Sequence, residues 1–147
     1  MTELATRFHK APKDTKPSFI SDVAVDFSTT SSVLILYDRA VIDNMITHLF
    51  ATTVGERGAM FEPTFGSRIP YFLHEPVNAT TAWKMETEIF ESIRRWIPYI
   101  TLITSQVRVD VDPDAGIYYL TVPYRITLPT YYNQVFTYAT IIQSLQK

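Results

Sequence analysis

Residues 107–128 read VRVDVDPDAGIYYLTVPYRITL and contain two alternating segments separated by a turn. Valines alternate with charged residues before the turn, and large apolar residues alternate with smaller or polar ones after it. A period of two is typical of a strand buried on one face, and Asp112-Pro-Asp-Ala-Gly116 is typical of a turn. We therefore predict a long antiparallel hairpin. Pro123 has no N–H to donate, so its strand should run along a sheet edge there or contain a bulge.

Two segments upstream have helical spacing. Asp38 is a candidate N-cap for a helix that ends before Gly55, and Asn78 or Thr80 can cap a second helix that Pro98 ends. The apolar stripes are Val41, Ile42, Met45, Ile46, Leu49 and Phe50 in the first helix, and Ala82, Met85, Ile89, Ile93 and Trp96 in the second.

These elements predict an α+β fold, with two main helices packed on a small, mainly antiparallel sheet that includes the long C-terminal hairpin. Alternation of Val23, Val25 and Phe27 indicates one further short strand. The segment Val135–Ile142 alternates weakly, which fits a third strand better than a closing helix.

Composition predicts one domain behind a basic arm. Residues 1–17 carry four basic and two acidic side chains, which gives the arm a charge of +2 and leaves about −4 on residues 18–147. We expect a flexible arm over 1–17 and a single domain over 18–147, a length ample for a buried core without disulfides. The chain has no cysteine, and its charged fraction of 19% is below the average of about 25%.

Several functional classes are disfavoured. A net charge of −2 argues against nonspecific nucleic-acid binding, and the longest clean apolar run, Val33–Tyr37, is far too short to span a membrane. The three histidines, His9, His48 and His74, stand far apart, so we expect no metal site and no cofactor.

The C-terminal third is almost free of charge. Between Ile117 and Gln146 Arg125 is the single charged residue, and seven of the nine tyrosines lie between Tyr99 and Tyr138. Sheet edges are usually protected by charges or cover, so we expect a surface here that meets other chains and adds strands to them. The alternative is that the tyrosines simply pack a small sheet against two helices.

No acid pair for glycan hydrolysis is fixed by the sequence. Such chemistry needs two carboxyl groups about 5 to 9 Å apart. We therefore expect that the protein is not an enzyme. The candidate carboxylates are Glu56, Glu62, Glu75, Glu86, Glu88 and Glu91.

The segment Gly55–Gly66, GERGAMFEPTFG, holds three of the four glycines and predicts a shaped loop anchored by Phe61 and Phe65. Together with the helix before it, this loop resembles the small baseplate wedge protein of contractile bacteriophage tails, whose family is often labelled lysozyme-like. The resemblance extends through IPYFLHEP at 69–76, the second helix and the hairpin, over roughly residues 35–128. Its most specific residues are Gly55, Glu56, Arg57, Pro63, Phe65 and Gly66.

The resemblance implies a structural subunit that joins other wedge proteins and initiates polymerisation of the tail sheath by strand addition. It implies a virion location in the tail baseplate after assembly in the host cytoplasm, with the tail tube as a further candidate partner. The type VI secretion baseplate component, which shares the family fold, is one alternative, and a glycan hydrolase is another. We expect the sheath-contact strands to include Tyr119, Arg125, Tyr131, Tyr132, Phe136 and Tyr138.

One departure from the family concerns the wedge contact. The family carries a Glu-Pro-Arg triplet after the second helix, where this chain has Ile97-Pro98-Tyr99 and so keeps only the proline. Arg94 and Arg95 lie one turn earlier and are candidates to replace the lost cation. The expected wedge-contact residues are therefore Arg94, Arg95, Ile97, Pro98 and Tyr99.

Overall fold

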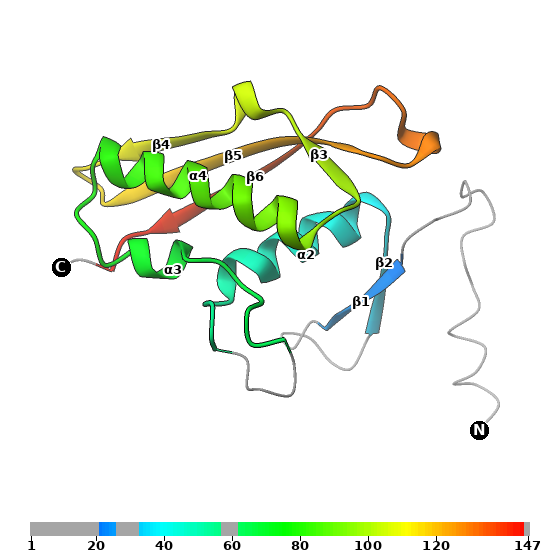
Figure 1. The fold of residues 1–147 in the computed structure, drawn as a ribbon, viewed down its shortest axis with the longest axis horizontal. Coiled ribbons are helices and arrows are strands. Elements are labelled where there is room, and N and C mark those ends of the chain that lie inside the picture. The colour runs from blue at the N-terminus through cyan, green and yellow to red at the C-terminus, as the bar shows by residue number, and fades with distance from the viewer. Residues whose placement is uncertain (1–20, 26–32, 57–61, 146–147) are drawn as a thin grey trace. The chain divides into compact units, whose positions relative to one another are not determined.

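A computed structural model describes residues 21–25, 33–56 and 62–145 (Figure 1). The chain forms two compact units, Met1–Val41 and Ile42–Lys147. In the first unit, β1 (Ser21–Val25) pairs antiparallel with β2 (Val33–Tyr37), so the expected short strand is present. The boundary expected after residue 17 lies outside the described residues.

Both expected helices form. Helix α2 (Arg39–Ala51) starts directly after Asp38, and α4 (Ala79–Trp96) starts after Asn78, whose side chain accepts a hydrogen bond from the Thr81 N–H at 2.9 Å. Asn78 is thus the cap, rather than Thr80. Helix α4 ends before Pro98 as predicted, and the short helix α3 (Ile69–Phe72) precedes it.

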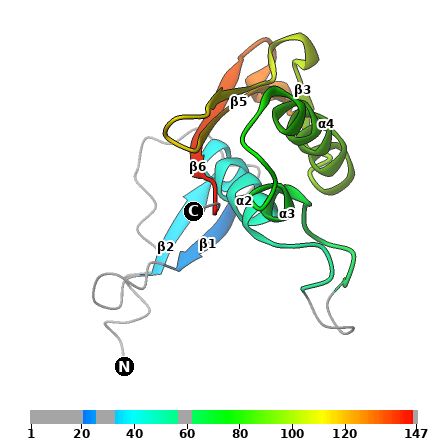
Figure 2. The same ribbon diagram turned by 90° about the vertical axis from the view of Figure 1, so that its left-hand side faces the viewer.

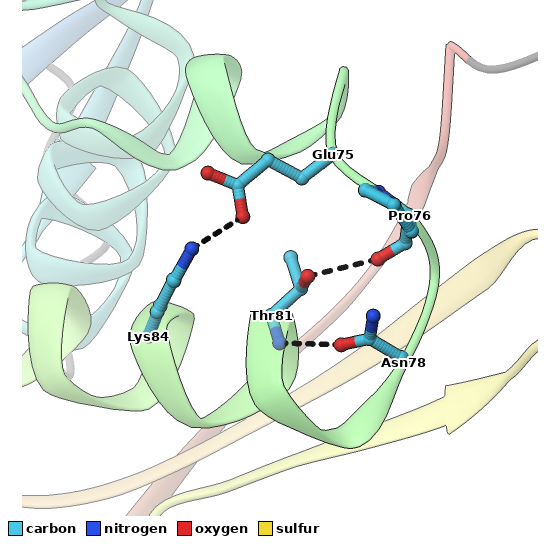
Figure 3. A network of polar contacts seen from close by, with 5 residues as sticks. All are labelled: Glu75, Pro76, Asn78, Thr81 and Lys84. Carbon is cyan, nitrogen blue, oxygen red and sulfur yellow. Dashed lines mark hydrogen bonds and ion pairs between the residues drawn. The ribbon is translucent and has the colours of Figure 1, made fainter.

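The start of α4 is tied to the preceding loop by further polar contacts (Figure 3). The Thr81 hydroxyl donates to the Pro76 carbonyl at 2.8 Å, and the Lys84 ammonium group lies 2.7 Å from the Glu75 carboxylate. These contacts and the Asn78 cap join the first turns of α4 to the loop before it.

The sheet of the second unit has four antiparallel strands: β3 (Ile100–Leu102), β4 (Arg108–Asp112), β5 (Ile117–Ile126) and β6 (Phe136–Gln143). Strand β5 is central, with β3 and β4 on one side and β6 on the other (Figure 1). The predicted hairpin is β4–β5. The segment at 135–142 is a strand rather than a closing helix, as the sequence pattern predicted.

Pro123 lies in β5 between the residues that pair with β4 and those that pair with β3. The Ile103 N–H donates to the Pro123 carbonyl at 3.1 Å, and in an antiparallel bonded pair Pro123 would have to donate in return. It cannot, and the β3 ladder gives way to a 3-10 turn, Thr104–Gln106, before β4 begins. The proline thus faces a local edge within a strand that is otherwise central.

The core lies between the helices and one face of the sheet, and both long helices lie on that same face (Figure 2). Tyr124 is fully buried and its hydroxyl donates to the Asp43 carboxylate on α2 at 2.7 Å. Burial also raises the pKa of Tyr118 above its ordinary value of 10.0. The core face of β5 consists of Tyr118, Leu120, Val122, Tyr124 and Ile126.

Candidate functional site

The outer edge of β6 is the strongest candidate for an interaction site. The Ser144 N–H donates to the Gly116 carbonyl at 2.8 Å, which marks a hydrogen-bonded pair at the end of the β5–β6 ladder. Bonded and non-bonded pairs alternate along an antiparallel ladder, and the register continues from this pair without a bulge. The backbone groups of every second residue therefore point away from β5. These residues are Thr137, Ala139, Ile141 and Gln143.

These outward groups are available for pairing. Among the described residues, β6 has β5 as its one strand partner, and its segment FTYATIIQ contains no charge. Immediately beyond it, the Leu145 N–H donates to the Leu73 carbonyl at 3.0 Å, so the edge is closed at that end. A stretch of about seven residues is left as an uncharged template for another strand.

The opposite edge, β4, is protected. Its sequence RVDVD carries three charged side chains. Val109 belongs to the outward-pointing set of β4, and its N–H is bonded at 2.9 Å to the Glu86 carboxylate, which reaches over from α4. Charges and a side-chain acceptor are recognised devices against edge pairing. The sequence showed the charges, but it did not indicate the role of Glu86.

The face of the sheet away from the helices carries two of the expected sheath-contact residues. Tyr119 and Arg125 are exposed there, with Tyr119 at 40% exposure. Tyr119 is paired across the ladder with Ile141, whose exposure of 64% makes it the more prominent apolar side chain. Sequence reasoning did not single out Ile141, although its position in an uncharged alternating segment was visible.

The other expected sheath-contact residues divide into two kinds. Tyr132 is 80% exposed in the loop before β6. Phe136 and Tyr138 face the helices instead: Phe136 packs on Tyr124 and Tyr131, and Tyr138 packs edge-on against Phe50 of α2. The simpler packing role proposed for the tyrosines thus describes Tyr131 and Tyr138, which the structure does not present as freely exposed contact residues.

The glycine loop has a defined shape at both described ends. Thr53 and Ser67 form a parallel bridge, and the Gly55 N–H donates to the Pro63 carbonyl at 3.0 Å. Gly66 has a φ of +125°, and a Cβ there would lie 2.6 Å from the Thr52 carbonyl oxygen, so only glycine fits. Arg57 and Phe61 lie outside the described residues.

Two further loop residues have structural contacts. The Glu56 carboxylate accepts the Thr53 N–H at 3.0 Å, and Phe65 packs edge-on against Trp96 of α4 with ring centroids 5.2 Å apart. Phe65 is thus an anchor of the loop, as expected.

The expected wedge-contact residues surround the end of α4. Arg94, Arg95, Pro98 and Tyr99 are exposed, and the Arg95 guanidinium lies 5.1 Å from the centre of the Trp96 ring. Ile97 is only 2% exposed and belongs to the core, so its inclusion among the contact residues was wrong.

A groove of about 460 Å³ adjoins these residues. Phe90 and Arg94 of α4, Pro98, and Leu102 of β3 are among its lining residues. It is therefore largely apolar with a cation at its rim.

Four of the six candidate carboxylates make structural contacts. Besides Glu56 and Glu86, Glu88 accepts the Arg68 N–H at 2.9 Å, and Glu75 pairs with Lys84. Over the described ranges, no cluster of histidine and acidic side chains could hold a metal ion, and no helix is long and apolar enough to cross a membrane.

Two solved structures share the fold of this chain. No family model and no curated protein matches the chain. A crystal structure from Geobacter sulfurreducens, described as a "putative tail lysozyme", matches with 25% identity and a TM-score of 0.58 over 72% of this chain and 90% of that one. A chain of the postcontracted pyocin R2 baseplate matches with 24% identity and a TM-score of 0.51 over 73% of this chain and all of that one, which shows likeness of fold.

Proposed function

We propose that this protein is a structural subunit of a contractile-tail baseplate, which joins wedge proteins and starts sheath polymerisation by pairing a sheath strand with β6. The carrying observation is the uncharged, unpaired edge of β6 beside a protected β4 edge. The shared fold with a chain of the pyocin R2 baseplate supports the location in a tail baseplate. The alternative, a type VI secretion baseplate component, would have the same structural role in a secretion-system baseplate.

The wedge contact is proposed at the end of α4. The groove lined by Phe90 and Pro98 offers an apolar surface, and Arg94 at its rim offers a cation to an acidic partner. This arrangement fits a wedge contact that is more apolar than the family triplet implies, because Ile97 supplies no charge there. The sheath and wedge surfaces lie on different elements, so they can be occupied together.

Ile141→Pro tests the sheath role. Proline removes one outward N–H and places its ring where the added strand would lie, while the ladder to β5 needs no donor from this position. We expect baseplates carrying this variant to assemble but to start no sheath, as seen by electron microscopy of purified tails. Ile141→Thr keeps the N–H and should assemble normally.

Two outcomes would contradict the proposal. Normal sheath on Ile141→Pro baseplates would exclude strand addition at β6. Loss of the subunit itself from Ile141→Pro baseplates, while Ile141→Thr is retained, would place the β6 edge in the wedge contact instead.

We further propose that the protein is not a hydrolase, although the Geobacter neighbour is described as a tail lysozyme. The carboxylates of Glu56, Glu86 and Glu88 each accept a backbone N–H. We expect no release of soluble fragments from peptidoglycan by the purified protein. Robust turnover that Glu56→Gln, Glu62→Gln or Glu88→Gln abolishes would overturn this.

A further inference from the structure

A pocket opens directly beside the free edge of β6. Its volume is about 330 Å³, which is at the lower end of the range for small-ligand pockets, about 300–1,000 Å³. One wall is the helix-facing side of β6, with Tyr138, Thr140 and Ile142, and the other walls come from α2 and α3. Apolar atoms dominate the lining, which includes Phe50, Ala51 and Leu73.

The adjoining edge defines the shape of the occupant. Thr137, Ala139, Ile141 and Gln143 direct their backbone groups outward, so a chain that satisfies them must be extended. Side chains of neighbouring strands at paired positions share a face. Residues of an added strand that lie opposite Tyr138, Thr140 and Ile142 would therefore face the helices, where the pocket lies.

The closed end of the edge limits where such a strand can lie. The Leu73 carbonyl already accepts the N–H of Leu145, the next outward-pointing residue after Gln143. An added strand can therefore pair alongside 137–143 but not past Ser144. The pocket lies at this end, next to Ile142 and Leu73, so it meets one part of the added strand.

We propose that this pocket receives a large apolar side chain of the sheath strand that pairs with β6, and that it thereby selects which strand is accepted and in which register. The inference rests on the proposed function and adds the requirement for an uncharged strand with a Leu, Ile, Met or aromatic residue facing the pocket. The edge supplies backbone pairing that any strand could use, whereas the pocket distinguishes one side chain from another.

The test fills the pocket and leaves the edge intact. Ala51 is exposed at the end of α2 and lines the pocket, so Ala51→Phe and the larger Ala51→Trp fill it without changing β6. Ala51→Ser is the matched control that keeps the space open. Binding of the purified sheath subunit of the same tail to each immobilised full-length variant is measured by biolayer interferometry, with Ile141→Pro in parallel and circular dichroism to check folding.

We expect Ala51→Phe and Ala51→Trp to weaken sheath binding about tenfold or more, the loss expected when a large apolar side chain is denied burial. Ala51→Ser should bind like the unaltered chain, and Ile141→Pro should abolish binding. A Leu→Ala or aromatic→Ala change in the sheath strand that weakens the unaltered chain, but not Ala51→Trp, would place that side chain in the pocket.

The other outcomes separate this inference from the proposed function. If Ile141→Pro abolishes binding and both Ala51 fillers bind normally, the edge is used without the pocket, and the inference fails alone. If none of these variants weakens binding, the proposed function fails as well. If the fillers abolish self-association of this chain but leave sheath binding unchanged, the occupant is a second copy, which also overturns the inference.

Discussion

Two of the three outer strands of the same sheet, β4 and β6, differ in how their outer edges are protected. Strand β4 carries the charged residues Arg108, Asp110 and Asp112, and its Val109 N–H donates a hydrogen bond to the Glu86 carboxylate. Strand β6 has no charge over eight residues and a pocket beside it instead of a protective side chain. Because exposed edges recruit other strands, this difference indicates that pairing is prevented at β4 and permitted at β6.

A strand that offers an outer edge for pairing can also be part of the core packing, as β6 is. Within the part of the chain that the structure describes, no strand pairs with the outward backbone of β6, but its helix-facing side chains are part of the packing. The Tyr138 hydroxyl lies 3.0 Å from that of Thr47, and its ring contacts Phe50. One strand thus combines a structural face with an unpaired edge.

The largest expected effect comes from removing this strand altogether. A chain that lacks residues 130–147 has no β6. Since Phe136, Tyr138 and Ile142 pack against the core, we now expect the truncated chain to lose its cooperative thermal transition, measured by circular dichroism. A sharp transition near that of the full chain would show that β6 is dispensable for folding.

The two faces of β6 should differ strongly in their response to truncation. Tyr138→Ala removes a ring packed on α2 and should lower the free energy of unfolding by about 2–4 kcal/mol. Ile141→Ala, on the exposed face, should change it by less than about 0.5 kcal/mol. Urea titration measures both. Equal losses would mean that the exposed face is covered in solution.

At β4, the protective contact can be removed singly. Glu86→Ala leaves the Val109 N–H without its acceptor and should cost about 1–2 kcal/mol, measured by urea titration. Glu86→Gln keeps an acceptor oxygen, so it should lower the free energy of unfolding by less than Glu86→Ala does. Hydrogen exchange at Val109 provides the check: protection should fall in Glu86→Ala, and unchanged protection would show that the contact with Glu86 is not formed.

The smallest effect on stability is expected when a charge is added to β6, as β4 has. The same change should clearly affect association. Ile141→Lys adds a charge at an exposed site and should shift the free energy of unfolding by less than about 0.5 kcal/mol. It should also reduce concentration-dependent self-association in sedimentation velocity. The same association in Ile141→Lys as in Ile141→Thr would locate self-association elsewhere.

Much of the fold was predictable because its signals are local. The alternation over 107–128 predicted the β4–β5 hairpin, the cap at Asn78 and the stop at Pro98 set the limits of α4, and the fold class was confirmed. Pro123 was correctly placed at a local edge or bulge, but the sequence could not show that β5 is central, because strand order depends on contacts between distant residues.

The candidate site was predictable only in outline. Lack of charge after Asp114 directed attention to the end of the chain that contains β6, yet side chains alone did not separate Tyr138, which packs inward, from Tyr119, which is exposed. Ile97 was taken for a contact residue and is part of the core. In each case the distinction depends on which face of an element meets its neighbour.

The sequence by itself determined the α+β class, the two helices, the hairpin and the uncharged C-terminal strand, because periodicity, caps and turn residues act over a few positions. Only the tertiary structure decided which edge is free, that Glu86 reaches from α4 to β4, and that Ala51, Leu73 and Ile142 enclose one pocket. Those features arise when segments tens of residues apart pack together, and local sequence patterns do not predict that packing.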